Sequence, residues 1–156
     1  MLFLIHILSF FSCKNENGLN NQNFNSSKAS FLLSDSTLHC YVWTNKMDSI
    51  ELQFAIYQSS AEITLVNGFL FYKFFEKDRS EGDISGIIKQ DTLFATYHFM
   101  SEGILSTAEH VFLIKESSVW EGYGEKEIKN GKEVFKNISQ ISFDSTAALQ
   151  KVSCEM

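Results

Sequence analysis

The sequence predicts an all-β fold, an antiparallel meander that closes into a small barrel. Short apolar and aromatic runs recur along the chain, and turn signals rich in Gly, Asn, Asp and Ser separate them. The chain has no proline, which suits long paired strands because proline removes a donor from the ladder. Cysteines stand near both ends of the strand-rich region, at Cys40 and Cys154. A meander whose ends are joined favours closure.

The first strands are expected at Leu38 to Trp43 and at Ile50 to Ile56. Apolar and polar residues alternate as in a half-buried strand at Ile50 to Ile56, and less cleanly at Leu38 to Trp43. The run from Ile63 to Phe75 is nearly continuously apolar and is broken only by Asn67-Gly68. It fits either one bulged strand or a tight hairpin. Further strands are expected at 84–88, 92–100, 110–115 and 119–123, at 128 and 134–135 on either side of Asn130-Gly131, and at 138–143.

The tail from Asp144 to Val152 is expected to form one or two helical turns, with Asp144 or Ser145 as the cap. This short helix would carry Cys154 back toward the first strand. In an oxidising compartment Cys40 and Cys154 would then form a disulfide. In the chain-entropy model such a bridge adds about 4–5 kcal/mol at the upper end. Two free buried thiols are the alternative.

The first thirteen residues resemble a bacterial lipoprotein signal. Leu2 to Phe11 is apolar, Ser12 is small, and Cys13 would be lipidated and become the new N-terminus. No Lys or Arg precedes Cys13, although secretory signals open with positive charge. The alternatives are a signal peptide without lipidation, a buried strand, and an uncleaved membrane helix. For that helix the run is shorter than the roughly 20 apolar residues of a span.

We therefore expect three segments: a lipoprotein signal at 1–12, the lipidated cysteine with a flexible tether at 13–30, and a single barrel domain at 31–156. The tether is rich in Asn and Ser and offers almost nothing to bury. These segments place the protein in the cell envelope. The outer membrane is the favoured location, and the side of the membrane is left open.

Composition excludes some classes of partner. The chain has a net charge of −6 and a single arginine, Arg79. Nucleic-acid binding needs basic patches, and so does electrostatic attachment to a membrane surface. Membrane attachment would come instead from lipid on Cys13. Hydrophobic residues make up 44% of the chain and charged residues 21%, which indicates a globular domain.

Several phrases resemble those of small bacterial lipoproteins of uncharacterised function. They are Phe75-Glu76-Lys77-Asp78-Arg79, Asp91-Thr92-Leu93-Phe94-Ala95, Phe99-Met100-Ser101-Glu102-Gly103, Glu121-Gly122-Tyr123-Gly124 and Asn130-Gly131-Lys132. The resemblance runs over roughly residues 38–154 and implies no catalytic motif. The rhythm of strands and glycines is similar to that of lipocalin-like and avidin-like barrels, a likeness of fold that does not give function.

The search for chemistry in the sequence assigns no catalytic residue, no metal and no cofactor. His39, His98 and His110 are isolated, and no Gly-x-Ser-x-Gly, His-x-His, Cys-x-x-Cys or calcium-loop pattern occurs. Glu102 and Glu121 are the candidates for a pair of carboxylates as in glycoside hydrolysis, and solvated residues at strand ends are the alternative.

Two signals point to binding. Aromatic residues make up 14% of the chain, and an aromatic wall with polar tips suits a ligand cavity. The candidates for this wall are Tyr72, Tyr97, Trp120 and Tyr123, and a Phe-rich core is the alternative explanation. Arg79, in a dense charged loop, is a candidate for gripping a carboxylate or a phosphate, and a solvated turn is the alternative.

Three hypotheses follow. The leading one is a non-catalytic, lipid-anchored envelope protein that binds a small apolar ligand in or at the mouth of its barrel. The second is a solid barrel that serves a structural role or binds another envelope protein. The third is an enzyme, such as a hydrolase of envelope polymers. The first predicts an interior void lined by aromatic rings, the second a filled interior with an exposed apolar patch, and the third a cleft with a perturbed titratable group.

Overall fold

The structure, a computed structural model, describes residues 37–58 and 64–154. The expected signal segment, Cys13 and the tether at 13–30 lie outside the described residues. The strands are β1 (Leu38–Asn45), β2 (Asp48–Gln58), β3 (Thr64–Lys73), β4 (Ser80–Lys89), β5 (Thr92–Ser101), β6 (Ile104–Ile114), β7 (Ser118–Tyr123), β8 (Lys126–Lys129), β9 (Lys132–Phe135), β10 (Ser142–Phe143) and β11 (Leu149–Val152). Within these ranges, no helix is long and apolar enough to cross a membrane.

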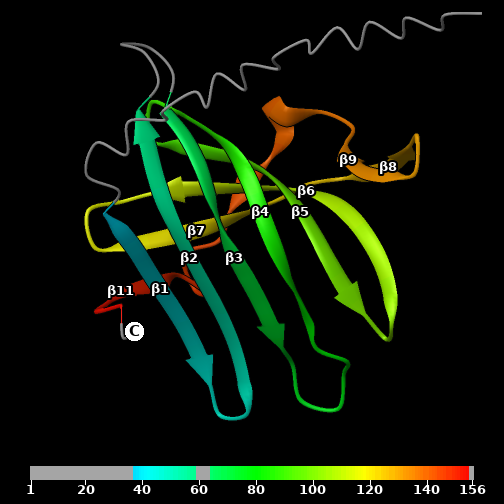
Figure 1. The fold of residues 1–156 in the computed structure, drawn as a ribbon, viewed down its shortest axis with the longest axis horizontal. Coiled ribbons are helices and arrows are strands. Elements are labelled where there is room, and N and C mark those ends of the chain that lie inside the picture. The colour runs from blue at the N-terminus through cyan, green and yellow to red at the C-terminus, as the bar shows by residue number, and fades with distance from the viewer. Residues whose placement is uncertain (1–36, 59–63, 155–156) are drawn as a thin grey trace, which may run out of the picture. The chain divides into compact units, whose positions relative to one another are not determined.

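Strands β1 to β7 form an antiparallel meander in which each strand pairs with the next. Strand β11 closes the ring, because it pairs with β7 on one side and with β1 on the other (Figure 1). The predicted small antiparallel barrel is therefore confirmed, with eight strands in its wall. The run from 64 to 73 is one continuous strand rather than a hairpin, and Gly68 pairs in register with both Phe54 and Ile84.

Alternation along the strands fills the interior. On β2, the inward-facing Ile50, Leu52 and Phe54 are each at most 3% exposed, whereas Glu51 and Gln53 face solvent. The other strands add side chains of the same kind, and together these make one continuous hydrophobic core. Its fully buried members include Val66, Leu70, Ile84, Leu93, Phe112, Val119 and Leu149.

The C-terminal region corrects two expectations. The helix predicted from Asp144 to Val152 is wrong: Thr146 donates its backbone N–H and its hydroxyl to the Asp144 carboxylate in a turn, and the chain then enters β11. The strand expected at 138–143 is shortened to β10, because a 3₁₀ helix spans Ile138–Gln140, and the Asn137 side chain caps it. Pairing with the edges of β1 and β7 therefore decides the structure of the C-terminal segment, and local helix propensity does not.

The predicted disulfide between Cys40 and Cys154 is present, with Cα atoms 5.4 Å apart. It joins Cys40 of β1 to Cys154, which follows the end of β11 at Val152, and the ladder between β1 and β11 has only three residue pairs. The covalent bond thus secures one of the short seams of the barrel. It ties together positions separated by 114 residues of sequence.

Candidate functional site

The barrel wall opens on one side, between β6 and β7. The ladder between these strands contains only three pairs, the last being Phe112 with Glu121. Beyond it, β6 pairs with β9 at Ala108, and β7 pairs with β10 at Gly122. Past their shared ladder, β6 and β7 thus each pair with a different strand, so that the two strands can diverge. This separation produces the space in which the candidate site lies.

Strands β8 and β9 form a hairpin that projects beyond β6 (Figure 1). Its base is fixed to the outer face of the barrel by Glu109, whose carboxylate accepts from the backbone N–H of Phe135 at 3.1 Å. Lys132 also reaches Glu109 at 3.2 Å and donates to the hydroxyl of Thr96 at 3.0 Å. The hairpin therefore completes the wall where β6 and β7 separate.

Glycines allow the strands to approach one another closely at this opening. A Cβ on Gly122 would lie 2.6 Å from a methyl carbon of Ile141, which shows that the segment leading to β10 crosses directly over β7. The backbone of β7 can accept the crossing only without a side chain at this position.

The cavity has a volume of about 430 Å³ and lies at the end of the barrel that carries the β3–β4 and β5–β6 connections. Cavities of this size are typical of small-molecule sites. Six aromatic rings line it: Tyr72, Phe74, Tyr97, Phe99, Tyr123 and Phe135. The opposite half of the barrel is filled by the core. The interior is therefore solid at one end and hollow at the other.

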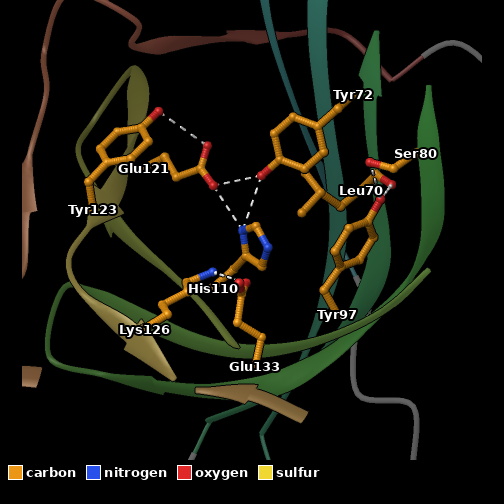
Figure 2. A network of polar contacts seen from close by, with 9 residues as sticks. All are labelled: Leu70, Tyr72, Ser80, Tyr97, His110, Glu121, Tyr123, Lys126 and Glu133. Atoms are coloured by element: carbon orange, nitrogen blue, oxygen red, sulfur yellow. Dashed lines mark hydrogen bonds and ion pairs between the residues drawn. The ribbon is translucent and has the colours of Figure 1, made fainter. Parts of the chain in front are cut away.

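A polar cluster lies on the cavity wall (Figure 2). Glu121 is the one charged side chain buried in the described residues, at 7% exposure. Its Oε1 accepts from the Tyr72 hydroxyl at 2.6 Å and from Nδ1 of His110 at 2.8 Å, and its Oε2 lies 3.5 Å from the Tyr123 hydroxyl. Three donors from three strands thus converge on one carboxylate, which offsets the cost of burying its charge.

The tyrosines of the cluster are held in their neutral form. Burial is the main reason that the pKa of Tyr97 and of Tyr123 is raised to about 12, and the Glu121 charge raises both further. Burial, then Glu121, raises the pKa of Tyr72 well above its ordinary value. The Tyr97 hydroxyl donates to the backbone carbonyl of Leu70 at 3.1 Å. The phenols therefore act as hydrogen-bond donors at any physiological pH.

The second ring nitrogen of His110, Nε2, faces the cavity. Among the described residues only Nδ1 of this ring has hydrogen-bonding contacts, to Glu121 and to the Tyr72 oxygen at 3.1 Å. No buried side-chain nitrogen or oxygen in these ranges lacks a partner, so Nε2 must be accessible. Because a carboxylate can only accept, Nδ1 carries the proton. In the neutral ring Nε2 then presents a lone pair to the cavity.

Charged groups complete the rim. Lys126, at the start of β8, donates to Glu133 of β9 at 3.0 Å and lies 4.9 Å from the centre of the Phe135 ring. Asp78, from the connection between β3 and β4, also lines the cavity. It shares a hydrogen bond with the exposed Glu102, whose pKa that bond raises.

The structure brings together three of the five residues predicted for ligand binding, Tyr72, Tyr97 and Tyr123. Trp120 lies elsewhere, since it alternates with the inward Val119 and Glu121 and so faces outward, where it contacts Ser118 and Lys115. Arg79 is exposed in the loop before β4 and does not line the cavity.

The sequence alone assigned no role to His110 and named Glu121 only as a candidate for a pair of carboxylates. Glu121 was a candidate only as a partner of Glu102, which lies at the exposed β5–β6 turn and does not line the cavity. The alternation of inward and outward side chains along β7 is the signal that could have identified Glu121. The inward face of β7 is already occupied by Val119, so Glu121 must also point inward, and a charge there requires partners.

No three His, Cys, Asp or Glu side chains of the described ranges are grouped to hold a metal ion. The arrangement instead provides an aromatic enclosure, a fixed carboxylate and one accessible imidazole nitrogen. Comparison with models of known protein families, with curated protein sequences and with solved structures found no match to this chain.

Proposed function

We propose that this protein is a non-catalytic, lipid-anchored binding module of the cell envelope, and that it takes a small, largely apolar ligand into the cavity. The observation that carries the proposal is the division of the barrel interior. One half is filled by fully buried apolar side chains, whereas the other half is a cavity of about 430 Å³ walled by six aromatic rings. Stability alone does not call for such an opening, because side chains that border open space forfeit packing contacts.

The anchoring part of the proposal rests on the sequence before the barrel. The apolar run, Ser12 and Cys13 suit lipidation, and the residues from 14 to 30 supply a polar tether before the barrel domain. Replacing Cys13 by Ala is expected to release the protein from the membrane fraction and to abolish the lipid mass on its N-terminal peptide. Retention of Cys13→Ala in washed membranes would contradict lipid anchoring at Cys13. It would not bear on ligand binding in the cavity.

Ligand binding is tested by native mass spectrometry of the full chain. A reproducible extra mass that is lost on denaturation is expected. The variant Ala108→Phe places a ring in the cavity and should remove that mass, whereas Trp120→Phe, outside the cavity, should retain it. Circular dichroism establishes that both variants fold. An identical mass for the folded and denatured wild type, with no probe bound on titration, would contradict the proposal.

A second candidate is supported by one surface feature. The β5–β6 hairpin exposes Met100, Ile104 and Leu105, of which Leu105 is 78% exposed. Met100 pairs directly with Leu105 across the hairpin, so the apolar side chains lie together at its tip. Such a group is typical of a contact with another protein. It is compatible with a binding cavity in the same barrel.

A further inference from the structure

The atoms that face the cavity indicate which chemical class of ligand it can bind. This step rests on the proposed function, because it assumes that the cavity is the ligand site. The acceptors on the wall are Nε2 of His110 and carboxylate oxygens. The donors are already engaged within the wall, since the Tyr72 and Tyr97 hydroxyls and the Lys126 ammonium donate to Glu121, Leu70 and Glu133, and Ser80 adds a hydroxyl that can also accept. A group that donates hydrogen bonds is therefore complementary to the wall.

The charges of the wall favour a cation. Three carboxylates line the cavity, those of Asp78, Glu121 and Glu133, against one ammonium, that of Lys126. Lys126 is held by Glu133 at 3.0 Å, and Nδ1 of His110 is held by Glu121 at 2.8 Å. Among the described lining residues, no cation is left to balance the charge of an anionic ligand. An anion would lose its hydration there without a counter-charge.

The aromatic lining favours a cation as well. The faces of aromatic rings attract ammonium groups within about 6 Å of the ring centre. The wall already shows this contact, since the Lys126 ammonium lies 4.9 Å from the centre of the Phe135 ring. Tyr72 and Tyr97 pack around His110, with ring centres 5.9 and 5.3 Å from that of the imidazole. Two tyrosine rings therefore lie beside the imidazole on which a cationic group would bind.

We propose that the ligand of this cavity is a protonated primary or secondary amine on an apolar body, with its N–H donated to Nε2 of His110. Glu121 acts as a positioning residue: it fixes the proton on Nδ1, so that Nε2 accepts, and it supplies the negative charge behind the imidazole. The apolar body lies against the aromatic rings toward the cavity mouth. Binding is non-covalent throughout.

The test compares probes that share one chain and differ in the polar end. Octylamine, octanol, octanoate and octyltrimethylammonium are titrated calorimetrically into the full chain at pH 8, where an alkylamine is charged. Octylamine is expected to bind at least tenfold more tightly than octanol. Octyltrimethylammonium, which has charge but no N–H, is expected to lie between them, and octanoate to bind most weakly.

Two variants assign the preference to the cluster. Glu121→Gln and His110→Phe are each expected to reduce the ratio of octylamine to octanol affinity to about one while octanol still binds, which also shows that the cavity remains folded. The matched control Glu116→Gln, an exposed carboxylate in the β6–β7 loop, should leave the ratio unchanged.

The outcomes separate the two claims. Equal affinity for octylamine and octanol, or tighter binding of octanoate, would overturn the amine assignment while leaving a ligand cavity in place. An unchanged ratio in both cluster variants would overturn the role of His110 and Glu121. If none of the four probes binds, both the amine assignment and the proposed function fail.

Discussion

Nδ1 of His110 and Oε1 of Glu121 lie 2.8 Å apart across the point where β6 and β7 separate. The ladder between the two strands ends with Glu121 itself, paired with Phe112. Beyond this pair, side-chain contacts connect β6 to β7 in place of backbone hydrogen bonds. Tyr72 joins them from β3 on the opposite wall, so that one carboxylate connects three strands of the barrel.

The Tyr72 hydroxyl should therefore contribute to stability. Tyr72→Phe removes a charge-assisted hydrogen bond to a buried carboxylate, and we expect the free energy of unfolding to fall by about 1.5–3 kcal/mol. Tyr41→Phe is the comparison variant, since Tyr41 is buried in the same barrel but makes no side-chain hydrogen bond to another described residue. Denaturant titration measures both variants, and equal losses would contradict the role given to Tyr72.

The close approach of β4 to β5 predicts a strong effect at Gly82. A Cβ at this position would lie 2.0 Å from the backbone oxygen of His98 and 2.6 Å from the Cα of Phe99, so the strands must move apart. We expect Gly82→Ala to cost on the order of 3 kcal/mol or more, at the upper end for single substitutions. The outward-facing Ser85→Ala on the same strand should change stability by less than about 0.5 kcal/mol. Thermal unfolding that is similar for the two variants would exclude such a tight contact.

The Cys40–Cys154 bond should account for a large part of the stability. The double variant Cys40→Ala, Cys154→Ala is expected to lose up to about 4–5 kcal/mol, because the bond limits the unfolded chain. Wild type in reductant should approach the double variant, and reductant should have no effect on the double variant itself. A wild type that is insensitive to reductant while its thiols become free would show that the ladder alone holds the seam.

The raised tyrosine pKa values predict a specific alkaline limit. In the unfolded chain these phenols ionise near pH 10, whereas the pKa of Tyr97 and of Tyr123 in the fold is about 12. The stabilisation is thus fully present below pH 10 and is lost as the pH rises from 10 to 12, because the unfolded state releases its protons first. Melting temperatures with tyrosinate absorbance measure this. Tyr123→Phe should reduce the slope, and ionisation of these phenols near pH 10 without loss of the fold would contradict their raised pKa values.

Strand alternation and turn residues in the sequence predicted most of the barrel. They located each of β1 to β7, because each contains a local apolar pattern that coincides with pairing, although β4 and β6 begin at Ser80 and Ile104, before the predicted runs. They failed for β11, since Leu149 to Val152 has no strand signal of its own and is recruited by the free edges of β1 and β7. The site was harder to predict, because the contact between His110 and Glu121 depends on where a ladder ends, and no periodicity in the chain encodes that point.

The half-solid barrel also has a consequence for how such a protein can diversify. On β3, β6 and β7 the members of an inward pair two residues apart have different surroundings: Leu70, Phe112 and Val119 are wholly enclosed, whereas Tyr72, His110 and Glu121 border open space. Substitution at the second position of a pair, such as His110, alters which ligand the cavity recognises. The packing of the enclosed first position, such as Phe112, stays intact. A lineage built on this scaffold can therefore change its ligand by substitutions at a few positions, with little need for compensating changes in the core.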